Sequence, residues 1–223
     1  MADSSATFRN LITTFTDFLT VAIHLILYER AIYPQTSFLS ARKYNFAVRQ
    51  NRHPKVCEWI NDAIAAVEAE LLRSAVERVV VVIYSEYSKP LERYVFDASR
   101  FPQVAASELD TPLVRTEANG EKSPILPLVD MDEQFRATLS KLSNAASKLK
   151  ALPPGCTFTV AIELREESEA PIRHPQPWMP VQPAISREDG DRAKIMTMPV
   201  RAVSAGEMVF EAWVEEASNT DDG

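Results

Sequence analysis

The chain of 223 residues is poor in the residues from which catalytic and metal sites are usually built: it has five glycines, three histidines and two cysteines. The glycines are dispersed, which excludes a phosphate-cradling loop and a dinucleotide fingerprint. His24, His53 and His174 show no metal-ligand spacing, and no G-x-S-x-G elbow occurs. We therefore expect a protein without catalytic activity, cofactor or metal. An enzyme of unknown type stays an alternative, because catalytic residues can lie far apart in sequence.

Basic charge and long apolar runs are also missing. The net charge is −7, whereas a dedicated nucleic-acid binder is usually basic. Cys57 and Cys156 fit no metal or redox spacing, which is typical of small core residues in a reducing compartment. The apolar run Phe18–Tyr28 is bounded by charges at eleven residues, whereas a membrane span needs roughly 20. We expect a nuclear or cytosolic protein with no signal peptide and no membrane contact.

Hydrophobic periodicity predicts three helices. Apolar residues recur at three- and four-residue steps in Thr7–Ile32, after His53, and in Asp130–Lys150. From Phe18 onward the first helix is apolar on nearly every side, so we expect it to be the central helix of the fold. His24 lies in this run and is interpreted as a hydrogen-bonded core histidine, because no acidic or nucleophilic partner is near it in sequence.

Five strands are predicted around these helices. The β-branched run Val76–Tyr84 indicates a strand buried on both faces, and Leu91–Phe96 completes a β-hairpin with it. Further strands are predicted at Cys156–Leu164, Lys194–Val203 and Met208–Val214.

Two regions read as loops. Phe38–Val48 is expected to be a loop that leads into a short extended piece. Arg100–Pro127 combines four prolines with an Asn-Gly pair, which predicts an exposed loop. The carboxylates around Glu163 and Glu166 are interpreted as a solvated strand end rather than a catalytic pair.

The stretch Glu166–Glu216 has an unusual composition. Five prolines fall within Pro171–Pro183, and no helix survives that spacing. The same stretch carries apolar side chains, Trp178 among them. An extended, aromatic-bearing segment of this kind can wrap around a binding partner.

One basic cluster is present. It comprises Arg42, Lys43, Arg49, Arg52 and Lys55. A solvated edge is the first interpretation, and a contact for an acidic partner or for DNA phosphates is the alternative.

Three stretches together resemble the HORMA domain family: VAIHLILYERAIYP (Val21–Pro34), VERVVVVIY (Val76–Tyr84) and PPGCTFTV (Pro153–Val160). Within that family the chain is similar to the accessory (mad-two-B type) subunit of translesion DNA polymerase zeta, as HPKVCEWI (His53–Ile60) and FEAWVEE (Phe210–Glu216) also indicate. The resemblance implies an α+β HORMA fold with three main helices packed on a mostly antiparallel sheet. It implies one domain over 1–223, with a core (1–165), a C-terminal safety belt (166–216) and an acidic tail (217–223).

The resemblance also implies a function. The protein would be a non-catalytic adaptor that traps a proline-containing peptide of the polymerase zeta catalytic subunit under the belt. It would bridge that subunit to the C-terminal domain of a scaffold translesion polymerase in DNA damage tolerance. A spindle-checkpoint or meiotic HORMA protein that clamps a different client peptide is the alternative. A HORMA homo- or heterodimer and a remodelling ATPase are further implied partners, and direct sequence-specific nucleic-acid binding is not expected.

The resemblance assigns roles by matching position. The peptide-binding candidates are Trp59, Trp178, Tyr33, Pro177, Met179 and Ile185. The candidates for binding the second partner are Thr197, Glu211 and Trp213, and Arg136 marks the dimer face. For the two tryptophans Trp59 and Trp178, plain core packing is the alternative.

Overall fold

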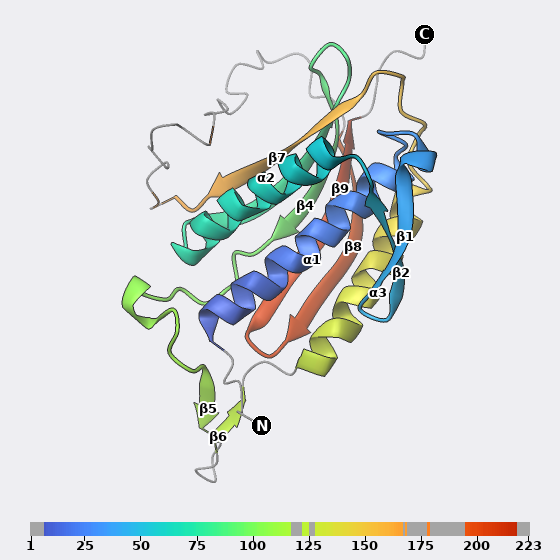
Figure 1. The fold of residues 1–223 in the computed structure, drawn as a ribbon. Helices are drawn as coiled ribbons and strands as arrows, with labels where there is room; N and C mark the ends of the chain where they lie inside the picture. Colours follow the sequence, from blue (N-terminus) through green and yellow to red (C-terminus); the bar gives the residue numbers. More distant parts are fainter. Residues whose placement is uncertain are drawn as a thin grey trace.

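The computed structural model describes residues 7–116, 122–124, 128–166, 168, 178 and 195–217. Its main body is an antiparallel sheet with three helices on one face, as Figure 1 shows. The helices are α1 (Phe8–Glu29), α2 (Pro54–Leu72) and α3 (Leu128–Ala146), and α1 lies between the other two. The α+β class and the central position of the first helix are as the sequence predicts.

The sheet has five strands in the order β7-β3-β4-β9-β8, and every neighbouring pair is antiparallel. The strands are β3 (Val76–Tyr84), β4 (Pro90–Asp97), β7 (Thr157–Leu164), β8 (Ile195–Ala205) and β9 (Met208–Ala217). The hairpin β8–β9, at the C-terminal end of the described chain, is docked on β4. This arrangement leaves β7 and β8 at the two edges of the sheet.

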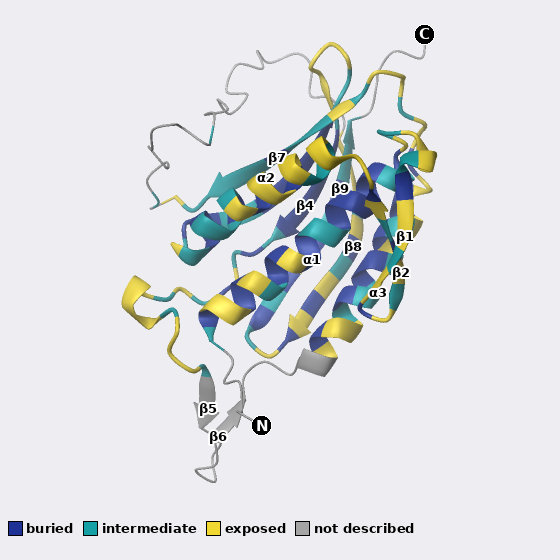
Figure 2. Ribbon diagram, in the orientation of Figure 1, coloured by how far each residue is buried: buried dark blue, intermediate teal, exposed yellow. Residues whose placement is uncertain are grey.

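The helix α1 is the centre of the core. Thr7 caps it, because its side-chain oxygen accepts a hydrogen bond from the Asn10 amide at 3.2 Å. Its buried face meets both layers: the Phe18 ring stacks on Phe135 of α3 at 4.6 Å and lies 5.5 Å from Phe210 of β9. The length and hydropathy of α1 alone would allow it to cross a membrane, but 67% of its most apolar window is buried within the fold, as Figure 2 illustrates.

The interpretation of His24 as a core histidine is confirmed. Its side chain is buried, and its Nδ1 accepts a hydrogen bond from the Asn51 amide at 3.4 Å. Burial lowers the pKa of His24 to about 4, because the charged form would lose its hydration. At neutral pH the ring is therefore uncharged and suited to its packing role.

The prediction of a loop at Phe38–Val48 is wrong, although the short extended piece predicted to follow it is present. Phe38–Lys43 (β1) and Phe46–Asn51 (β2) form an antiparallel hairpin beside α1. The two turn residues, Tyr44 and Asn45, adopt left-handed conformations with φ of 53° and 52°. Such two-residue turns usually contain glycine, so Tyr44-Asn45 carries no recognisable hairpin signal. The Tyr44 ring fixes the turn by packing 5.1 Å from Phe135.

The prediction that Arg100–Pro127 is an exposed loop is wrong in part. The stretch contains a 3-10 turn, Ala106–Glu108, and a short hairpin of β5 (Val114–Thr116) and β6 (Lys122–Pro124). Pro112 forms a β-bridge with Thr7, and Leu109 and Leu113 pack against the core. These contacts tie the stretch to the start of α1.

Candidate peptide and partner surfaces

The strand β7 offers a free edge. It pairs with β3 on one side, and no described strand pairs with its other side. A free edge presents unpaired backbone N–H and C=O groups, which can accept an added strand from another chain. The sheet can therefore be extended by a peptide along Thr157–Leu164.

Aromatic side chains line the helix side of this edge. Phe158 of β7 is contacted edge-on by Trp59 of α2 at 4.9 Å and by Tyr33 at 6.4 Å between ring centroids. Trp59 remains 42% exposed, so it is not a core residue. Partial burial raises the pKa of the Tyr33 hydroxyl. The three rings form an aromatic ledge, Tyr33–Trp59–Phe158, beside the free edge.

The other predicted peptide contacts are placed only in part. Trp178 is half-buried and packs against the main core. Pro177, Met179 and Ile185 lie outside the described residues. Phe158 was not predicted as a site residue, although an aromatic at the start of the predicted strand, just after Pro153-Pro154, was a usable signal.

The three residues predicted to bind a second partner share one face of the β8–β9 hairpin. Thr197 and Glu211 are exposed and Trp213 is half-buried. Their cross-strand partners are Glu215, Ala202 and Pro199 respectively, so all of them point away from the helices. Ile195, which alternation along β8 places on the same face as Thr197, is 54% exposed. This surface is apolar with acidic positions, which suits a partner that presents apolar and basic side chains.

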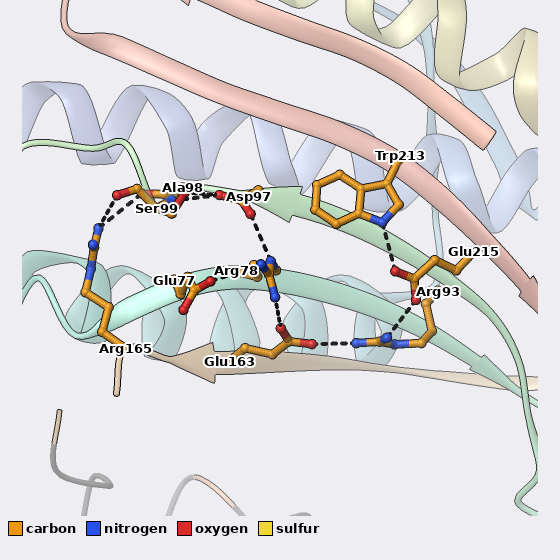
Figure 3. A network of polar contacts seen from close by, with 10 residues as sticks. All are labelled: Glu77, Arg78, Arg93, Asp97, Ala98, Ser99, Glu163, Arg165, Trp213 and Glu215. Carbon is orange, nitrogen blue, oxygen red and sulfur yellow. Dashed lines mark hydrogen bonds and ion pairs between the residues drawn. The ribbon is translucent and has the colours of Figure 1, made fainter. Parts of the chain in front are cut away.

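Glu163 lies at the end of β7 with a side chain that is 37% exposed, as the sequence predicts, but it is also ion-paired. Its two carboxylate oxygens bind two arginines: Oε2 accepts from Arg78 Nη1 at 2.9 Å and Oε1 accepts from Arg93 Nη2 at 2.5 Å. Arg93 also binds Glu215 at 2.6 Å, and Glu215 accepts a hydrogen bond from Trp213 Nε1 at 2.8 Å. Figure 3 shows these contacts on the sheet face opposite the helices.

The charged side chains of this face cover a small apolar cluster. Val80, Val82 and Val95 are buried beneath them. Hydrogen bonds to Asp97 and Glu163 raise the pKa of Arg78 above its ordinary value. Partial burial opposes ionisation of Asp97, but hydrogen bonds from Ser99 and Arg78 prevail and lower its pKa. Arg78 and Asp97 are thus held in their charged forms.

Side chains of the basic cluster contact neighbouring residues of the same protein. The Arg49 guanidinium lies 4.8 Å from the centre of the Tyr28 ring, Lys43 pairs with Asp17 at 3.3 Å, and Arg52 donates to the Thr36 carbonyl at 2.9 Å. These contacts favour the solvated edge over a phosphate site. Arg136, on α3, is 41% exposed and pairs with Glu133 at 3.3 Å; its dimer role stays a prediction.

No catalytic arrangement emerges within the described part of the chain. It holds no group of three or more His, Cys, Asp or Glu side chains that could bind a metal. Of the groups with large pKa shifts, His24, Tyr44 and Tyr94 are buried, and Arg78 lies on the outer face of the sheet. The two cysteines are free and half-buried, and Cys156 packs against the main core. Cys57 donates to the Asn51 carbonyl at 3.0 Å.

Comparison with known proteins decides the family. The HORMA domain matches residues 12–208. The chain belongs to the HORMA domain family. Over 221 residues it is 34% identical to the DNA polymerase zeta processivity subunit of Schizosaccharomyces pombe, covering 98% of this chain and 99% of the relative. It is 30% identical to human mitotic spindle assembly checkpoint protein MAD2B, covering 91% of this chain and 89% of the relative.

Solved HORMA structures share the fold. A chain of a mitotic checkpoint complex superposes with a TM-score of 0.70 at 18% identity, covering 93% of this chain and 99% of that one. Caenorhabditis elegans HTP-2, solved with a HIM-3 closure motif, gives 0.62 at 11% identity, covering 96% and 93%. At these identities the likeness is one of fold, and it places the docked β8–β9 hairpin within a HORMA architecture that extends over nearly the whole chain.

Proposed function

We propose that this HORMA protein is a non-catalytic adaptor subunit of translesion DNA polymerase zeta. It traps a proline-containing peptide of the catalytic subunit along the edge of β7, beneath the belt segment. The observation that carries the proposal is the free β7 edge with the aromatic ledge Tyr33–Trp59–Phe158 beside it. The full-length similarity to a polymerase zeta processivity subunit supports this choice of client.

Two kinds of contact would hold the peptide. Pairing along β7 supplies main-chain hydrogen bonds, and pockets for alternate side chains supply selectivity. Proline and aromatic side chains of the peptide fit the ledge, because Trp59 exposes a broad apolar surface there. A belt that passes over the peptide adds a kinetic effect, since the peptide leaves only after the belt opens. We therefore expect slow dissociation.

The hairpin β8–β9 provides the second half of the adaptor. Its outward face, with Thr197, Glu211 and Trp213, would bind the C-terminal domain of a scaffold translesion polymerase. The peptide edge and this face belong to opposite ends of the strand order, β7 and β9–β8. Two partners can therefore bind at the same time, as bridging in the nucleus requires.

The experiment uses peptides tiled from a polymerase zeta catalytic subunit. One or more should bind the full chain and dissociate slowly in surface-based kinetics. Trp59→Ala and Trp178→Ala should each accelerate dissociation. Tyr87→Ala is the control, because Tyr87 lies in the β3–β4 turn and is 88% exposed. The adaptor function is contradicted if none of the peptides binds slowly and neither tryptophan matters.

A second client class is a spindle-checkpoint or meiotic protein. The similarity to the mitotic spindle assembly checkpoint protein MAD2B of Danio rerio and of human supports this alternative. The same kinetic experiment separates the two, with closure-type peptides from checkpoint and meiotic partners run beside the polymerase peptides. The tighter, slower-dissociating set identifies the client.

A further inference from the structure

The polar contacts on the outer face of the sheet form one continuous chain. It runs from Trp213 and Glu215 on β9, through Arg93 on β4, to Glu163 on β7, and on to Arg78 on β3. Figure 3 shows the residues in this order. This network of contacts therefore crosses the sheet from β7, the strand with the free edge, to β9, which carries part of the proposed partner surface.

Glu163 is the branch point of this chain. Each of its oxygens binds a different arginine, and each arginine has a further partner near β9. Arg93 binds Glu215 at 2.6 Å, and the Arg78 guanidinium lies 5.9 Å from the centre of the Trp213 ring. An arginine near an aromatic face is attracted to it electrostatically. Both series of contacts that start at Glu163 thus reach β9. One ends at Glu215, which binds Trp213, and the other ends at the Trp213 ring.

The position of Glu163 exposes it to whatever binds at β7. It lies on the edge strand and points away from the helices, as its partner Arg78 does. A strand added to β7 would place alternate side chains next to Glu163, because cross-strand neighbours lie about 5 Å apart. A bound peptide would therefore restrict or displace the carboxylate that holds Arg78 and Arg93.

We propose that Glu163 is a positioning residue that couples the free edge of β7 to the belt strand β9 and to the orientation of Trp213. A peptide at β7 then changes the affinity of the Trp213 surface for its partner, and that partner changes the affinity for the peptide by the same factor. This coupling deepens the adaptor function proposed above and rests on it. The contacts by which Glu163 stabilises β9 in the free protein do not depend on the adaptor function.

The coupling should be modest. Glu163 and Arg93 side chains are each 37% exposed, and ion pairs of that exposure are weakened by solvent and salt. Loss of Glu163 should accelerate local opening of β9 by about two- to fivefold, the range that exposed ion pairs support.

The test is hydrogen–deuterium exchange of the full chain, comparing wild type with Glu163→Gln. The amides of Met208–Ala217 should exchange about two- to fivefold faster in the variant. Glu86→Gln is the control, because Glu86 is an exposed carboxylate in the β3–β4 turn and should leave β9 unchanged. Unchanged β9 exchange in Glu163→Gln overturns the proposal.

A second variant checks that the effect of Glu163→Gln does not come from a folding defect. Arg93→Lys keeps the charge but cannot bridge Glu163 and Glu215 with one planar group, so it should give the same β9 acceleration. High salt should raise β9 exchange in wild type and leave Glu163→Gln less affected. If no polymerase peptide binds while β9 exchange responds, the adaptor function fails and the positioning role stands. If a peptide dissociates slowly and β9 exchange does not change in the variant, the adaptor function stands and the positioning role of Glu163 fails.

Discussion

Arg30 and Glu92 form a buried, two-point ion pair that joins the end of α1 to the sheet. Arg30 Nη2 and Nε lie 2.6 and 3.0 Å from the two Glu92 oxygens, and the side chains are 7% and 2% exposed. Arg30 also donates to the Ala146 carbonyl at the end of α3, and the Tyr94 hydroxyl donates to Glu92 at 2.9 Å. One charged pair thus holds two helix ends against β4, next to the docked belt strand.

Removing one partner of this pair should be costly. Arg30→Met leaves the Glu92 carboxylate buried without its counter-charge, and we expect the free energy of unfolding to fall by about 3–5 kcal/mol. Urea denaturation measures the change. The double variant Arg30→Met/Glu92→Leu should recover part of the loss, because no isolated charge remains. Arg9→Met, which breaks the exposed pair with Asp110, should have a much smaller effect; an equal effect would contradict the role of burial.

His24 should make the protein less stable in mild acid. The ordinary pKa of a histidine is 6.5, and burial lowers that of His24 to about 4 in the folded state. As pH falls below 6.5 the unfolded state binds the proton first, so the free energy of unfolding decreases until about pH 4, by roughly 3 kcal/mol from this group. Urea denaturation at pH 7, 5.5 and 4.5 measures the slope. His24→Gln should flatten it, and an unchanged slope would assign the acid sensitivity to other groups.

Regular elements of this fold were predictable because their signals are local. The periodicity of α1 and the β-branched run of β3 each report burial directly in the sequence. The β1–β2 hairpin was not predictable, because its turn is held by the Tyr44 ring against Phe135, about 90 residues further along the chain. A turn that depends on tertiary packing leaves no Asn-Gly signature.

The residues of the candidate site differ in how much of their role could be predicted from the sequence. Trp59 was placed by its match to the family, and its exposure agrees with a binding role, although that role is still a prediction. Phe158 and Glu163 gained their significance only from the fold, since their partners Trp59, Arg78 and Arg93 are distant in sequence. A carboxylate in an acidic stretch cannot be told from a solvated one until the strand order brings arginines beside it.

The buried hydroxyl of Tyr44 has no hydrogen-bond partner among the described residues. An unsatisfied buried polar group costs about 1–3 kcal/mol, so Tyr44→Phe should raise the free energy of unfolding by about 1 kcal/mol. Tyr94→Phe is the matched control, because its hydroxyl donates to Glu92 and its removal should destabilise by a similar amount. Thermal and urea denaturation of both variants check the opposite signs. Destabilisation by Tyr44→Phe would mean that the hydroxyl has a partner.

Trp59→Ala should separate binding from stability. The ring is 42% exposed and makes one edge-on contact with Phe158, so the free energy of unfolding should fall by only about 1 kcal/mol. Its loss from the aromatic ledge should weaken binding of the polymerase peptide by about 30-fold, as for a central interface aromatic. Phe18→Ala, in contrast, should cost about 3–5 kcal/mol of stability through a core cavity. Urea denaturation and peptide dissociation rates, measured on both variants, make the comparison. If the Trp59→Ala protein is strongly destabilised but, when folded, binds the peptide as the wild type does, Trp59 has a packing role rather than a binding role.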